Sequence, residues 1–174
     1  MLPNLVSTFE GLRGGSVSDG RLVDLSRNLA RGLTFLHNKI AHLDINPSNL
    51  CVTDNHHLQI IDFDVSVWVK SEDSQIDGYV GNEGWMAPEI GTKTSQRKLY
   101  SPIKANKYSC GRIFRIFADA HGEDDEGLGR FADRLMDQNP YERPQLIEWC
   151  EPDKSQTYSP NLDETMVADE GMVT

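Results

Sequence analysis

Five leucines near the start of the chain recur at intervals of three and four positions. They are Leu22, Leu25, Leu29, Leu33 and Leu36. This spacing places all of them on one face of an α-helix. Ser18 or Asp19, just before the stripe, is suited to cap the first turn. Because a helix with one apolar face must bury that face, the spacing predicts an amphipathic core helix over residues 21–38.

The pattern changes after Pro47, where helical spacing gives way to two short apolar runs. The runs LCVT and LQIID flank the sequence DNHH. Short apolar runs around an Asp-Asn turn are typical of a β-hairpin. The second run ends at Asp62, and from there to about residue 100 the chain is polar with scattered glycines. A connection of this length inside a compact domain is usually functional or mobile.

Helical spacing returns in the C-terminal half, over residues 105–118 and 128–135. The segment PQLIEWC predicts a last short helix with Pro144 near its first turn. Beyond Glu151 the chain is polar and rich in acids, which predicts disorder. We therefore expect a mainly α fold with a small β-hairpin, in one domain over residues 1–150 followed by an acidic tail over residues 151–174.

Charge and cysteine content narrow the possible functions. The formal net charge is −10, which argues against nonspecific binding to nucleic acid or to an anionic membrane surface. No apolar run approaches the length that crosses a bilayer, and the N-terminus lacks the pattern of a secretory signal. The three cysteines are far apart and odd in number. They predict neither a disulfide framework nor a zinc site, and they favour a reducing compartment, the cytoplasm or the nucleus.

The loop AHLDINPSNL, residues 41–50, sets Asp44 five positions before Asn49. Phosphoryl transfer needs a carboxylate that orients the attacking hydroxyl and accepts its proton, together with oxygen ligands for magnesium ions. Asp44 and Asn49 supply one of each, and Asp62 supplies a second metal ligand. Because Asn49 and Asp62 bracket the same pair of predicted strands, the hairpin fixes the distance between them. Taken alone, Asp44 is also compatible with an ordinary turn.

Four motifs in order resemble the C-terminal lobe of a eukaryotic protein kinase. They read HLDINPSNL, IIDFD, GWMAPEI and DQNPYERP, where the family has H-R-D-x-x-x-x-N, D-F-G and A-P-E for the first three. The resemblance runs from about residue 12 to residue 150. It implies a protein-kinase-like large lobe with the small lobe missing, ATP and Mg²⁺ as cofactors, and a protein as substrate or binding partner.

The resemblance also implies a role for each matching residue. Asp44 would be the catalytic base, and Asn49 and Asp62 would be the magnesium ligands. The floor beneath the adenine ring would include Leu50, Cys51 and Ile61.

Other matching residues would be structural. His42 and Phe63 would stack in the spine of side chains that links the two lobes of the family. Glu89 and Arg143 would form a buried ion pair that holds the substrate-binding segment. The loop between Asp62 and Glu89 would be the activation loop. Asn106 stands where the family usually has an acid.

The chain also departs from the family. It contains no Gly-rich loop and no strand lysine before the leucine stripe, so we expect a fragment, a truncated gene model, or a domain completed by something absent. Leu43 replaces the arginine that binds a phosphate on the activation loop, which suggests that the usual phosphorylation switch is lost. Asn46 stands where Ser/Thr kinases carry a lysine, so one positive charge is missing. Asp64 replaces the glycine of D-F-G and adds negative charge.

Three functions remain open at this stage. The first is transfer of phosphate from ATP to Ser or Thr of protein substrates, if a small lobe completes the domain. The second is a pseudokinase, a binding module without catalysis. The third is a small-molecule phosphotransferase of the aminoglycoside or choline kinase type, which also favours an acid after D-F but lacks APE and the later RP turn. As an isolated chain we expect weak nucleotide binding and little or no catalysis.

Overall fold

The structure is a computed structural model that describes residues 19–96, 98–121 and 126–150. The predicted acidic tail and the predicted cap at Ser18 lie outside the described residues. Within the described ranges no helix has both the length and the apolar character needed to cross a membrane.

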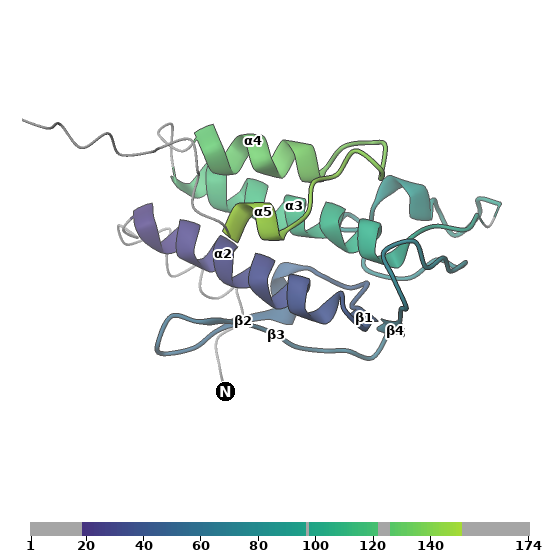
Figure 1. The fold of residues 1–174 in the computed structure, drawn as a ribbon, viewed down its shortest axis with the longest axis horizontal. Coiled ribbons are helices and arrows are strands. Elements are labelled where there is room, and N and C mark those ends of the chain that lie inside the picture. Colours follow the sequence, from purple (N-terminus) through teal and green to yellow (C-terminus); the bar gives the residue numbers. More distant parts are fainter. Residues whose placement is uncertain (1–18, 97, 122–125, 151–174) are drawn as a thin grey trace, which may run out of the picture.

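The body of the described structure is a layered set of α-helices. They are α2 (Asp19–Leu36), α3 (Pro102–His121), α4 (Glu126–Leu135) and the short α5 (Ile147–Cys150). Helix α3 lies between α2 and α4 and contacts both, and α5 packs on α2 (Figure 1). The leucine stripe faces this core: Leu29 and Leu33 are fully buried in it. The predicted core helix is confirmed, although α2 begins and ends two residues earlier than the spacing suggested.

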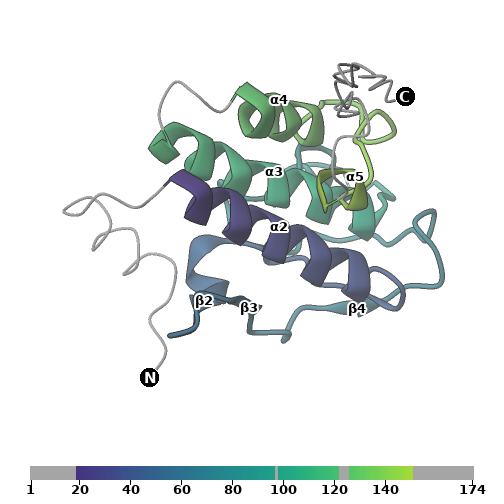
Figure 2. The ribbon, with the colours of Figure 1, turned by 60° about the vertical axis from the view of Figure 1, so that its left-hand side comes forward.

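A β-hairpin covers the other side of α2 (Figure 2). Strands β2 (Leu50–Val52) and β3 (Leu58–Ile60) pair antiparallel, with Leu50 opposite Ile60. This hairpin is the predicted one. A second antiparallel pair joins β1 (Ile40–Ala41) to β4 (Val67–Trp68), and the sequence did not predict it because two-residue strands carry no readable period.

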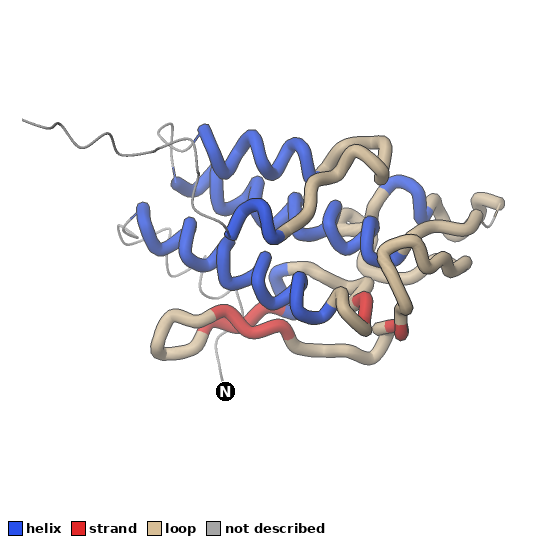
Figure 3. Tube along the Cα trace, viewed as in Figure 1, coloured by secondary structure: helices blue, strands red, loops and turns tan. Residues whose placement is uncertain are grey.

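The long connection after the hairpin gathers at one end of the helices and is mostly loop (Figure 3). Two single 3₁₀ turns interrupt the irregular segments, η1 (Pro47–Asn49) and η2 (Pro88–Ile90). The connection is nevertheless well packed, because several of its residues form a second hydrophobic cluster that is separate from the main core. The buried members of this second cluster are Ala41, Leu43, Val69, Ala87, Ile90, Tyr100, Ile103 and Ala105. The cluster fixes the loop of residues 41–50 against the long connection and against the start of α3.

Candidate functional site

Asp44 and Asn49 are in direct contact. Asn49 Nδ2 donates to Asp44 Oδ2 at 2.8 Å and to the Asp44 backbone oxygen at 2.9 Å. The turn η1 brings the two residues together, because it reverses the chain between them. The other carboxylate oxygen, Asp44 Oδ1, is buried and has no hydrogen-bond partner among the described residues. A buried carboxylate oxygen without a partner is costly, so this atom is poised to accept a hydrogen bond from a ligand.

Asn46 is occupied entirely within the loop. Its Oδ1 caps η1 by accepting from the Ser48 backbone N–H at 2.9 Å, and its Nδ2 donates to the Asp44 backbone oxygen at 3.1 Å. The residue is only 3% exposed. At the position where the family's lysine neutralises a phosphate, this chain therefore has a structural amide that holds the loop in shape.

His42 connects the loop to the end of the hairpin. Its Nε2 lies 3.0 Å from the Ile61 backbone oxygen, and its Nδ1 lies 3.3 Å from the Asp44 backbone N–H. These partners assign the proton to Nε2. Burial lowers the pKa of His42, and it outweighs the opposing effects of the Ile61 bond and of the charges of Asp44 and Asp62. The ring is therefore neutral near pH 7. It also meets Phe63 edge-on, with ring centroids 4.7 Å apart, as the resemblance implied.

Asp62 emerges beside Asn49. The Ile61 backbone N–H donates to the Asn49 backbone oxygen at 3.0 Å. This bond extends the hairpin ladder by one residue, and Asp62 follows directly after it. Asp62 is exposed, and its φ of 64° lies in the left-handed region, as does the φ of 67° at Leu43. Such a conformation costs a non-glycine residue about 1–2 kcal/mol and tends to occur at functional sites.

Within the described ranges, no three His, Cys, Asp or Glu side chains gather in a way that could hold a metal ion. The magnesium pair of Asn49 and Asp62 therefore stays a prediction. The adenine floor also stays a prediction: Leu50 is fully buried in the main core, Cys51 is buried in β2, and Ile61 is 40% exposed.

Leu43 has become part of the second hydrophobic cluster. Its side chain is buried among apolar neighbours, so no cation is available at this position to bind a phosphate. Its backbone N–H donates to Asn106 Oδ1 at 2.8 Å. Asn106 is itself buried near the start of α3, so the amide ties the loop to the central helix.

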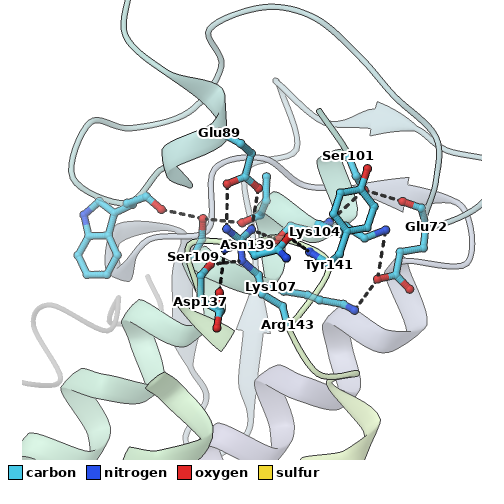
Figure 4. A network of polar contacts seen from close by, with 12 residues as sticks. Glu72, Glu89, Ser101, Lys104, Lys107, Ser109, Asp137, Asn139, Tyr141 and Arg143 are labelled. Carbon is cyan, nitrogen blue, oxygen red and sulfur yellow. Dashed lines mark hydrogen bonds and ion pairs between the residues drawn. The ribbon is translucent and has the colours of Figure 1, made fainter. Parts of the chain in front are cut away.

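The predicted ion pair between Glu89 and Arg143 is confirmed. Arg143 NH1 and NH2 donate to the two oxygens of Glu89 at 2.6 and 2.8 Å, and NH1 also donates to the Lys104 backbone oxygen at 2.8 Å (Figure 4). A bidentate pair of this kind fixes direction as well as distance. It holds η2 against the helical body.

A pocket of about 360 Å³ opens in front of Asp44. Its lining includes Asp44, Tyr79, Glu83 and Lys93. Glu83 accepts from the Tyr79 hydroxyl at 2.8 Å and lies 3.6 Å from Lys93 Nζ. A carboxylate at the edge of a polar pocket is positioned to meet a hydroxyl group that enters from solvent.

Gly81 also lines this pocket, and its replacement gives a first prediction. Its φ is 113°, and an added Cβ would lie 2.6 Å from the Leu43 backbone oxygen. We expect Gly81→Ala to lower the free energy of unfolding by about 2 kcal/mol, from strain plus the clash. Gly84 has a φ of 87° but open space around it, so Gly84→Ala should cost about 1 kcal/mol. Urea denaturation measures both, and equal losses would contradict the assigned contact with Leu43.

The fold is that of a protein-kinase-like large lobe, with the His-Asp-Asn loop on one side of a hairpin and Asp62 on the other. The family model for the protein kinase domain matches residues 3–121. The chain belongs to the protein kinase family, as the motifs indicated.

Individual relatives agree with this assignment. Mitogen-activated protein kinase kinase 9 of Arabidopsis thaliana is 42% identical over 84 residues, which cover 47% of this chain and 26% of that protein. Serine/threonine-protein kinase mig-15 of Caenorhabditis elegans is 30% identical over 119 residues, 68% of this chain and 11% of that protein. The chain thus spans between 11% and 26% of the length of these two relatives.

Proposed function

We propose that this chain forms the catalytic-loop side of a protein kinase site, which passes the γ-phosphate of ATP to Ser or Thr hydroxyls of protein substrates when a small lobe completes it. The observation that supports this most is the state of Asp44. One of its carboxylate oxygens is held by Asn49, the other is buried without a hydrogen-bond partner in the described part of the chain, and the residue lines a pocket.

In this mechanism Asp44 orients the substrate hydroxyl and accepts its proton. Asn49 uses its Nδ2 to hold the carboxylate, which leaves its Oδ1 for a cation. Asn49 and Asp62 would hold Mg²⁺, and the bound ion would neutralise charge on the phosphates. His42 keeps the Asp44 and Asp62 segments in fixed register, because it contacts the backbone on both sides.

A protein substrate is favoured over a small alcohol by the segment around Glu89. The Glu89–Arg143 pair joins the APE segment to the later RP turn, and phosphotransferases of the aminoglycoside or choline kinase type lack both of these segments. A pseudokinase is the second candidate. It is favoured by Asn46, which is buried and committed to the loop, so that the transferring phosphate lacks a positive charge there.

The experiment is the thermal midpoint of the chain with and without Mg-ATP. Ligand that binds only the native state raises the midpoint by mass action. We expect a rise that Asp62→Asn abolishes and that the neighbouring Asp64→Asn leaves in place. Absence of any rise at millimolar Mg-ATP would overturn the nucleotide site.

Catalysis is tested separately, in a version of the chain completed by a small lobe, by transfer of labelled phosphate from ATP to a mixed Ser and Thr peptide library. Asp44→Asn supplies the background. A rise in midpoint without transfer above that background would favour the pseudokinase, and transfer to a small alcohol alone would favour the third function.

A further inference from the structure

The segment between Asp62 and Glu89 is held to the helical body by a second set of polar contacts, which no family motif indicated. Glu72 lies at its centre. One carboxylate oxygen accepts from Lys107 Nζ at 2.6 Å, and the backbone oxygen accepts from Ser101 Oγ at 2.5 Å (Figure 4). The other carboxylate oxygen accepts from Gln145 Nε2 at 2.8 Å. The start of α3 and the segment before α5 thus converge on one acidic residue.

Lys107 is unusual for a helix lysine because it is 1% exposed. A buried ammonium is costly unless a carboxylate faces it, and Glu72 is the acid that does. Burial lowers the pKa of Lys107, although the hydrogen bond and the charge of Glu72 oppose that effect. Burial alone would raise the pKa of Glu72, but the bonds from Lys107 and Gln145 and the nearby positive charges bring it below its usual value. Glu72 and Lys107 thus each favour the charged form of the other.

Lys104 adds a second cation from the same helix. Its Nζ lies 3.1 Å from Asp73 Oδ1 and 3.8 Å from Glu72 Oε1, and it sits over the Tyr141 ring at 4.8 Å. Two consecutive acids of the loop thus meet two lysines one turn apart on α3. This arrangement provides in advance the opposite charges that a phosphate and its arginine would otherwise supply.

The contacts of Glu72 lie close to the pocket along the chain. Four residues after Glu72, Ile76 exchanges two backbone hydrogen bonds with Tyr100, at 3.0 and 2.9 Å. The chain then enters the pocket at Tyr79 and Gly81. Both ties precede the pocket, so together they hold the stretch that leads into it.

We infer that Lys107 and Glu72 are positioning residues that hold the activation loop permanently in place, so that its order does not depend on phosphorylation. The burial of Leu43 fits this inference, because no cation is left there to receive a phosphate. The inference rests on the proposed function only where it treats the segment between Asp62 and Glu89 as an activation loop. Its test measures local order and can fail or succeed whatever the chain does with Mg-ATP.

Hydrogen exchange of the full chain tests the inference. Backbone amides of residues 70–80 should be protected in phosphatase-treated protein to the same extent as before treatment. In Lys107→Met their exchange should accelerate by about tenfold or more, while amides of α4 change by less than about twofold, because only the local opening becomes easier. Lys93→Met, which removes the exposed ion pair with Glu83, is the matched control and should leave residues 70–76 unchanged.

Two results would overturn the inference. One is protection of residues 70–80 that disappears with phosphatase. The other is an equal acceleration of residues 70–80 and of α4 in Lys107→Met, which would indicate a general loss of stability. If Lys107→Met does not fold, exchange of the same amides is measured in Glu72→Gln, which keeps the size of the side chain. Exchange should accelerate there in the same local pattern.

Discussion

Replacing Arg143 with methionine is expected to lower the free energy of unfolding by about 3–5 kcal/mol, because it strands a partly buried carboxylate. The Arg143 side chain is 0% exposed and Glu89 is 15% exposed. The guanidinium also satisfies two backbone oxygens, those of Lys104 and Asp137, at 2.8 and 3.0 Å. Methionine fills much of the volume but donates no hydrogen bond, so all of these acceptors lose their partner.

Urea denaturation of matched variants separates this effect from the mere loss of a charge. Arg134 pairs with Glu148 at 3.5 Å, and their side chains are 59% and 47% exposed. Arg134→Met should therefore cost less than about 1 kcal/mol. The double variant Arg143→Met with Glu89→Gln should recover part of the loss, because the stranded charge is gone. A cost for Arg143→Met no larger than that for Arg134→Met would contradict the buried pair.

Hydrophobic spacing was sufficient to predict the larger elements of the fold. The leucine stripe predicted α2 because its residues pack on a single core, and two apolar runs around Asp-Asn predicted the hairpin of β2 and β3. The pairing of β1 with β4 was beyond such reasoning. Ala41 pairs with Val67 across a large gap in sequence, and both residues pack in the second cluster.

The polar contacts also include one that the sequence predicted and one that it did not. The spacing of Asp44 and Asn49 predicted their convergence, because a five-residue interval with Pro47 between them suits a tight reversal. The contact between Glu72 and Lys107 spans 35 residues and carries no local pattern. From the sequence alone Lys107 would be interpreted as an ordinary solvated lysine. Only its burial on α3 in the folded chain changes that interpretation.

The structure also gives physical reasons for two departures from the family. Leu43 replaces a cation with an apolar side chain, and the surrounding cluster makes that exchange favourable. Asn46 replaces a lysine with a residue that caps η1 through its side chain, and asparagine is among the best residues for that task. Both changes strengthen the loop itself while removing charge from the site.

Stability should fall by about 3 kcal/mol between pH 7 and pH 4 on account of His37 alone, because its proton affinity differs between the folded and unfolded chain. Burial, followed by the charge of Lys107, lowers the pKa of His37 from 6.5 to about 4, against an opposing effect of Glu72. Below pH 6.5 His37 therefore binds a proton in the unfolded chain but not in the folded chain. The contribution is complete above that pH, declines as the pH falls, and levels off near pH 4.

The geometry explains why the folded protein resists this proton. His37 Nε2 lies 3.4 Å from Asn106 Nδ2, while Asn106 Oδ1 accepts from the Leu43 backbone N–H at 2.8 Å. The Leu43 bond orients the amide, so its Nδ2 must donate to a neutral Nε2. Protonation would set two donors against each other and would disturb the amide that ties the Asp44 loop to α3.

His37→Gln isolates this effect, since glutamine can accept the same bond but does not titrate. Urea denaturation of both proteins should show a difference in free energy of unfolding that changes by about 1.5–2 kcal/mol between pH 6.5 and pH 5, where few carboxylates titrate. His42 is present in both proteins and cancels from the comparison. Parallel pH profiles for the two proteins would mean that His37 titrates normally in the folded chain, and the link from His37 through Asn106 to the Asp44 loop would then lack its electrostatic basis.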